Sequence, residues 1–83
     1  MPKPAPQKSL FSPEYDAFMV LLRKTRENAG LTQVQAAAKL KRPQSYVSKC
    51  ESGERRVDVV ELMQFCEANE TDATRFVRRL KGT

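Results

Sequence analysis

The side chains with the greatest potential for chemistry in this 83-residue chain are two cysteines, Cys50 and Cys66, because the sequence contains no histidine. Two soft ligands fall short of the roughly four that a zinc site needs, so no metal site is predicted. The lack of histidine also removes the commonest general base, and the three glycines stand singly rather than in a phosphate-binding loop. We therefore predict neither an enzyme nor a cofactor, and expect both cysteines to be core residues in a reducing cytoplasm.

Charge is the second feature with chemical meaning, and it is unevenly distributed. The chain has 15 Lys and Arg against 10 Asp and Glu, which gives a net charge of +5. Residues 31–56 contain six bases and two acids, whereas residues 57–70 contain four acids and no base. A basic segment of this kind is typical of a nucleic-acid-binding protein, although an ordinary solvated surface would have the same composition.

The length and the first residues limit the possible architectures. Eighty-three residues make one small domain, and no run approaches the ~18 consecutive apolar residues of a membrane span. Residues 1–12 contain three prolines, two lysines and no acid, which predicts a flexible basic arm ahead of a domain over 13–83. Because the start of the chain also lacks the apolar region of a signal peptide, a cytoplasmic, nucleoid-associated location is expected.

Capping residues and apolar periodicity divide the rest of the chain into five short helices without strands. The expected N-caps are Ser12, Thr32, Asp58 and Asp72. We predict helices over about 13–29, 33–40, 44–51, 59–69 and 73–81. In the fourth helix the apolar residues at positions i, i+3, i+4 and i+7, which are expected to share one face, are Val59, Leu62, Met63 and Cys66.

The predicted helices over 33–40 and 44–51 have the spacing of two short helices joined by a tight turn. The segment Gly30 to Gln33 leads into the first helix, the second covers Gln44 to Glu51, and the exit runs from Gly53 to Arg56. In this register the chain resembles the Cro/XRE (phage-repressor-type) helix-turn-helix family over about residues 15–80. The resemblance implies an all-α fold, a five-helix lambda-repressor-like DNA-binding domain. It also implies a regulator of transcription that binds double-stranded DNA and is usually a homodimer.

In this family the second helix of the motif enters the major groove by its N-terminal end, and here that helix begins at Gln44. Its outward side chains suit base edges, because Gln pairs bidentately with adenine, Lys donates to guanine, and Ser bonds several edges. The implied base contacts are Gln44, Ser45, Ser48 and Lys49. Val47 and Cys50 are expected to face the core.

The resemblance also implies phosphate contacts around this helix. A glutamine at the start of the preceding helix, together with the free backbone N–H groups there, can bind a phosphate, and arginines neutralise phosphates. The implied set is Gln33, Arg42, Tyr46, Arg55 and Arg56. For Tyr46 the alternative is simple packing, and for the arginines it is a solvated charge.

Arg26 and Glu51 have a different implied role. The family places an arginine of the first helix against the acid at this position. We predict a partly buried, bidentate ion pair that fixes the first helix against the third.

Two positions depart from the family pattern. The inter-helix turn commonly has glycine before an apolar residue, where this chain has Lys41 and Arg42. A left-handed Lys41 would cost about 1 kcal/mol or more, so a turn of different shape is expected. The junction before the last helix often has Leu-Gly in the family, where this chain has Asn69 and Glu70, and Asn69 can supply the left-handed residue there.

Two classes of function fit these features. The first is a transcriptional regulator, acting as a repressor by occupying its site, with the last helix and its flanks as the dimer surface. The second is an antitoxin or other protein–protein interaction module that uses the same domain. Its natural partner-facing surface is an acidic stretch formed by Asp58, Glu61, Glu67 and Glu70. These acids fit equally a solvated face turned away from DNA.

Overall fold

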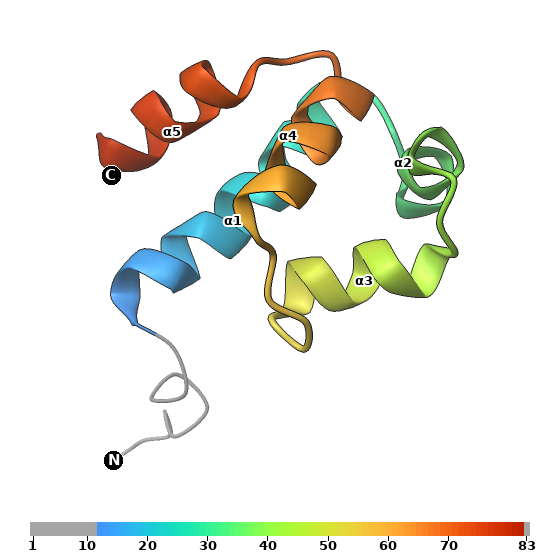
Figure 1. Cartoon of the computed structure of the whole chain (residues 1–83), viewed down its shortest axis with the longest axis horizontal. Coiled ribbons are helices and arrows are strands. Elements are labelled where there is room, and N and C mark those ends of the chain that lie inside the picture. Colours follow the sequence, from blue (N-terminus) through green and yellow to red (C-terminus); the bar gives the residue numbers. More distant parts are fainter. Residues whose placement is uncertain (1–11, 83) are drawn as a thin grey trace.

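The computed structural model describes residues 12–82 and shows five helices, with no strand in that range (Figure 1). They are α1 (Pro13–Asn28), α2 (Gln33–Leu40), α3 (Gln44–Ser52), α4 (Val59–Ala68) and α5 (Ala73–Lys81). The predicted all-α class is confirmed, and the helix bounds agree with the predicted ones to within one residue. The predicted basic arm, apart from Ser12, lies outside the described residues.

Side-chain caps begin four of the five helices. Ser12 Oγ accepts a hydrogen bond from the Tyr15 N–H at 3.0 Å, and Asp72 caps α5 through the N–H groups of Thr74 and Arg75. The starts of α2 and α4 are reciprocal capping boxes formed by Thr32 with Gln35 and by Asp58 with Glu61. α3 begins after Pro43, and no side chain caps it. The backbone N–H groups of its first turn therefore donate to no capping side chain.

The turn between α2 and α3 corrects one expectation. Lys41 takes the left-handed conformation, with φ 57° and ψ 43°, although it is not glycine. The Arg42 N–H donates to the Ala37 carbonyl at 3.0 Å and the Lys41 N–H donates to the Ala38 carbonyl at 3.1 Å. This is the Schellman arrangement, and it requires a left-handed residue between the two helices. The turn therefore keeps the helix-turn-helix geometry, although the left-handed conformation strains the backbone at Lys41.

The junction of α4 and α5 corrects a second expectation. Asn69 is not left-handed, with φ −99°, and the positive φ of 60° falls one residue later at Glu70. Asn69 is buried, and its Nδ2 donates to the Phe65 carbonyl at 2.8 Å. This bond keeps Asn69 close to the helical conformation, so the chain reverses at Glu70. Thr71 N–H then closes the turn on the Cys66 carbonyl at 2.9 Å.

The core has a larger and a smaller part. The larger part joins α1, α4 and α5 and includes Leu22, Phe65 and Phe76. The smaller part lies between α2 and α3, where Ala36 and Ala37 face Val47, and the small alanines allow the two helices to approach closely. Both cysteines are buried and unpaired, and burial raises the pKa of Cys50 and raises that of Cys66 to about 11.

The apolar face predicted for α4 is partly wrong. Leu62 and Cys66 are buried as expected, but Val59 is 69% exposed and Met63 is 56% exposed. The buried face turns instead towards Phe65, which packs in the same core cluster as residues of α1 and α5. Val59 and Met63 are left beside the exposed Val77 of α5 in a shallow apolar groove. None of the helices in residues 12–82 is both long and apolar enough to cross a membrane.

Candidate nucleic-acid interface

α2, the turn and α3 form the helix-turn-helix, and α3 presents a polar face to solvent. Val47 and Cys50 are buried against the core. Gln44, Ser45 and Lys49 are exposed, and Ser48 is partly exposed. Figure 1 shows α3 and α5 at opposite sides of the view, with α1 and α4 between them. Three of the four predicted base contacts are thus exposed at the start or along the outer side of α3.

Arg26 and Glu51 form the predicted ion pair between α1 and α3. Arg26 Nε lies 2.6 Å from Glu51 Oε2, and Arg26 Nη2 donates to Glu51 Oε1 at 3.1 Å. Arg26 Nη1 also donates to the Leu31 carbonyl at 2.8 Å. The two side chains are 10% and 5% exposed, and the hydrogen bond to the carboxylate raises the pKa of Arg26. The pair therefore holds α3 and the start of α2 on α1.

Gln33 extends this pair to the surface. Its Nε2 donates to Glu51 Oε1 at 3.1 Å, and its Oε1 accepts a hydrogen bond from Gln44 Nε2 at 2.7 Å. A chain of side-chain hydrogen bonds thus runs from the buried Arg26 to Gln44 at the exposed start of α3. Gln33, predicted from the family resemblance as a phosphate contact, has both ends of its amide engaged by other side chains.

The ring of Tyr46 lies between two arginines. The guanidinium carbon of Arg42 is 4.4 Å from the ring centroid and that of Arg55 is 4.8 Å from it. The ring is half-buried, and burial raises the pKa of its hydroxyl. It packs against both parts of the core. Tyr46 therefore packs against the core and holds two cations beside α3, while its predicted phosphate contact stays a prediction.

Arg55 is also paired with an acid. Its Nη1 and Nη2 donate to the two carboxylate oxygens of Glu61 at 3.0 and 2.7 Å. These bonds, with a further one from the Asp58 N–H, lower the pKa of Glu61 to about 2. The positive charge of Arg55 is therefore balanced by Glu61, unlike the charge of an arginine that is free to bind a phosphate.

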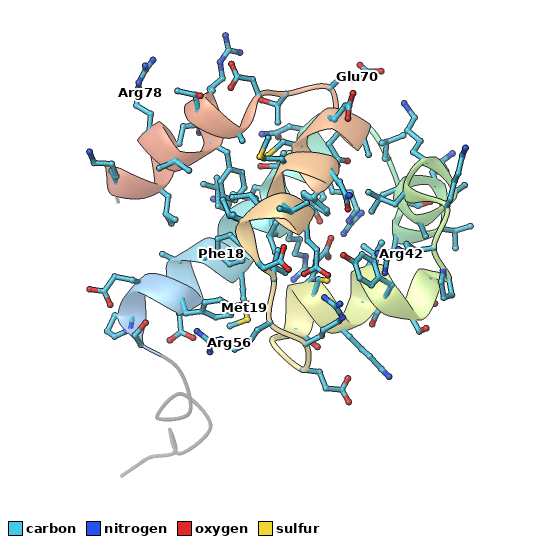
Figure 2. The ribbon with its side chains drawn as sticks, in the orientation of Figure 1. Phe18, Met19, Arg42, Arg56, Glu70 and Arg78 are labelled. Atoms are coloured by element: carbon cyan, nitrogen blue, oxygen red, sulfur yellow. The ribbon has the colours of Figure 1, made fainter. Side chains whose placement is uncertain are left out.

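Arg56 and Arg42 lie at different ends of this surface. The guanidinium carbon of Arg56 is 4.2 Å from the centroid of the Tyr15 ring on α1. Tyr15 Oη in turn accepts a hydrogen bond from the Val57 N–H at 3.2 Å. In the view of Figure 2, Arg42 lies beside α3, Arg56 is drawn in front of or beside α1, and Arg78 lies on α5 at the upper left. Each of the two stacked arginines thus stands on an aromatic ring near one end of α3.

The acidic stretch of residues 57–70 is less uniform than its composition indicates. Glu61 is paired with Arg55, and Glu70 Oε2 lies 3.4 Å from Lys39 Nζ of α2. Two of the four acids are therefore compensated by bases from the helix-turn-helix segment. Within residues 12–82, no three His, Cys, Asp or Glu side chains gather as a metal ion would require.

Several contacts of the site were missed by sequence reasoning. Among them are the Gln33–Gln44 bond, the Arg55–Glu61 pair and the stacking of arginines on Tyr46. The capping-box role of Glu61 was visible in the sequence, but its second partner comes from a loop that precedes the helix. Only the three-dimensional path of residues 53–58 brings Arg55 to it.

The comparisons with known proteins agree with this geometry. A family model for a helix-turn-helix domain matches residues 17–80. Among solved structures, an XRE-family-like protein from Pseudomonas syringae pv. tomato is 43% identical, with a TM-score of 0.82 over 92% of this chain and 93% of that chain. No curated protein matches the chain.

Two further structures are less similar in sequence. The clp gene regulator ClgR from C. glutamicum is 22% identical, with a TM-score of 0.75 over 87% of this chain and 94% of that one. The restriction-modification controller protein C.Esp1396I is also 22% identical, with a TM-score of 0.78 over 87% of this chain and 92% of that one. These two show the shared fold. The family model and the 43% identical structure show that the chain belongs to the Cro/XRE-type family of helix-turn-helix DNA-binding regulators.

Proposed function

We propose that the protein is a sequence-specific repressor that binds double-stranded DNA and reads the major groove with α3. The observation that carries this proposal is the polar start of α3, where Gln44 is exposed yet held by Gln33 on the buried Arg26–Glu51 pair. A reading side chain that is fixed before binding loses little conformational entropy when it meets a base. Ser45, Ser48 and Lys49 complete the proposed reading surface.

The proposed phosphate contacts surround α3. Arg42 and Arg56 are exposed and stand on aromatic rings, so they are the main candidates. Arg55 contributes less because Glu61 balances its charge. Gln33 would bind a phosphate through its remaining hydrogen-bonding capacity and the N–H groups at the start of α2, and Tyr46 would act through Arg42.

We further propose that two copies bind a pseudo-palindromic site as a homodimer. A single domain of this size reads too few base pairs for high specificity, and two-fold operators match two-fold proteins. The apolar groove lined by Val59, Met63, Ala73 and Val77 would form the dimer surface, since exposed apolar patches of this kind mark interfaces. This extends the predicted surface from α5 and its flanks to the groove between α4 and α5.

The dimer is tested by analytical ultracentrifugation of wild-type protein and two variants. Met63→Glu places a charge in the groove and is expected to give monomers that bind the operator more weakly. Val20→Glu is the matched control, because Val20 is 55% exposed on α1, outside the groove. If Met63→Glu leaves the assembly state unchanged, the groove is not the dimer surface.

DNA recognition is tested by anisotropy titrations with random genomic fragments at two salt concentrations. Steep salt dependence, together with a fragment bound about a thousandfold more tightly than bulk DNA, is the expected result. Gln44→Ala should change the preference at one base position, whereas Arg42→Ala should weaken all sequences alike. Weak binding without salt dependence would contradict the proposal, and it would favour the second candidate, an antitoxin or other protein–protein interaction module that uses the same domain.

A further inference from the structure

We propose that Glu51 is a positioning residue for base recognition, because it determines through Gln33 which edge of the Gln44 amide faces the DNA. The inference rests on the proposed role of Gln44 as a base reader. It assigns to the buried ion pair a part in choosing the base, in addition to holding α1 against α3.

The first step is the orientation of Gln33. An ionised carboxylate only accepts hydrogen bonds, so the end of the Gln33 amide that faces Glu51 must be the nitrogen. The distance from Gln33 Nε2 to Glu51 Oε1 is 3.1 Å. Glu51 cannot rotate away, because Arg26 binds both of its oxygens and its side chain is only 5% exposed. The buried acid thus excludes the flipped Gln33 amide.

The second step is the orientation of Gln44. With its nitrogen on Glu51, Gln33 turns its oxygen towards Gln44, and Gln44 Nε2 donates to that oxygen at 2.7 Å. One amide hydrogen of Gln44 is used in this bond. The other hydrogen and Oε1 lie on the same edge of the amide, which then presents one donor and one acceptor side by side.

The third step is the base that fits this edge. In the major groove adenine presents an acceptor at N7 beside a donor at N6, whereas guanine presents two acceptors, N7 and O6. The edge of Gln44 with one donor and one acceptor complements adenine. If Gln33 were flipped, Gln44 would turn its oxygen inward and its two N–H donors outward, the pattern that fits guanine. Glu51 therefore favours adenine over guanine at the base pair that Gln44 reads.

The experiment uses the full-length protein and the duplex that it selects from a randomised library, remade with each of the four base pairs at every position. Wild-type protein should prefer adenine over guanine at one position by at least about fivefold. In Gln33→Met, which leaves Arg26 and Glu51 in place, this ratio should fall towards one. Gln64→Met, an exposed glutamine of α4 changed in the same way, should keep the wild-type ratio.

Glu51→Gln tests the acid itself, since a glutamine can present either its oxygen or its nitrogen to Gln33. Its adenine-to-guanine ratio should fall as in Gln33→Met, and the double variant should show no further fall. Thermal unfolding is measured alongside, because a merely structural Glu51 would lower Tm and leave the ratio unchanged. An unchanged ratio in folded Glu51→Gln overturns the proposal. Should that variant not fold, an unchanged ratio in Gln33→Met does so.

Gln44→Ala separates this inference from the proposal on which it rests. If Gln44→Ala leaves the base preference unchanged at every position, then Gln44 does not read a base and the proposed reading surface is wrong. If Gln44→Ala abolishes the adenine preference while Gln33→Met and Glu51→Gln both keep it, only the positioning role of Glu51 is wrong.

Discussion

Arg55 and Glu61 face each other across the start of α4, and both terminal nitrogens of the arginine donate to the carboxylate at 3.0 and 2.7 Å. The pair joins the loop after α3 to the first turn of α4. Glu61 Oε1 also accepts the Asp58 N–H at 3.0 Å, so one carboxylate closes the capping box and holds the loop. An arginine that the family resemblance assigns to DNA phosphate thus also links the loop after α3 to α4.

Replacement of Arg55 by Ala should therefore lower the stability of the protein. We expect a small but measurable loss in the free energy of unfolding, because the pair is bidentate but partly exposed. Urea denaturation measures it. Arg23→Ala is the matched control, since Arg23 and Glu27 are more exposed and lie 3.4 Å apart within α1. Equal losses in the two variants would show that the Arg55–Glu61 pair contributes no more than an ordinary surface pair.

Arg42 should behave differently from Arg55 in DNA binding. Arg42→Ala removes a cation that stands on the Tyr46 ring and belongs to none of the ion pairs formed within residues 12–82. The slope of log affinity against log salt should become shallower by about 1 for this variant, as expected for one lost phosphate contact. The change in slope should be smaller for Arg55→Ala. A larger change for Arg55 than for Arg42 would reverse the proposed ranking of the two arginines.

Acid should destabilise the protein in part through Glu61. Its pKa is about 2 in the folded protein, below its ordinary value of 4.5, so the folded state favours the ionised carboxylate. This stabilisation is fully present above about pH 4.5 and is lost as the pH falls towards 2. The Tm of Glu61→Gln should accordingly be lower than that of wild type near neutral pH, and the difference should shrink between pH 4.5 and 2. Asp72, whose pKa is also lowered, acts in both proteins and cancels in the comparison.

Lys41→Gly should stabilise the protein although it removes a side chain. Lys41 has φ 57°, and a residue with a Cβ adopts this conformation at a cost of about 1 kcal/mol or more. Lys41→Ala removes the same charge and keeps the strain, so it is the control. The free energy of unfolding from urea titrations should be higher for Gly than for Ala by about 1 kcal/mol. A less stable glycine variant would mean that the turn is not strained.

Local sequence signals predicted the helices because each start depends on a few adjacent residues. Thr32 with Gln35, and Asp58 with Glu61, satisfy the first N–H groups of their own helices, and these bonds require no knowledge of the rest of the fold. The ends were harder to predict. The left-handed residue falls at Lys41 and Glu70 because the Schellman bonds to the preceding helix fix the place of the reversal, whatever side chain stands there.

The candidate site was less predictable than the helices. The Arg26–Glu51 pair came from a family resemblance, because nothing in the spacing of 25 residues brings two side chains together. The exposure of Met63 depends on which side of α4 the other helices cover. The amide orientations of Gln33 and Gln44 follow only once Glu51 is known to lie beside them.

The chain has two tyrosines and no tryptophan, and both rings lie under guanidinium groups, Tyr46 under Arg42 and Arg55 and Tyr15 under Arg56. The intrinsic ultraviolet emission of the protein therefore comes from rings that touch the cations proposed to meet phosphate. Drawing an arginine off its ring would change the emission of that tyrosine. Tyrosine emission can thus report on these arginines without an added label. In the Tyr46→Phe variant only Tyr15 would remain, and its emission would report on Arg56 alone.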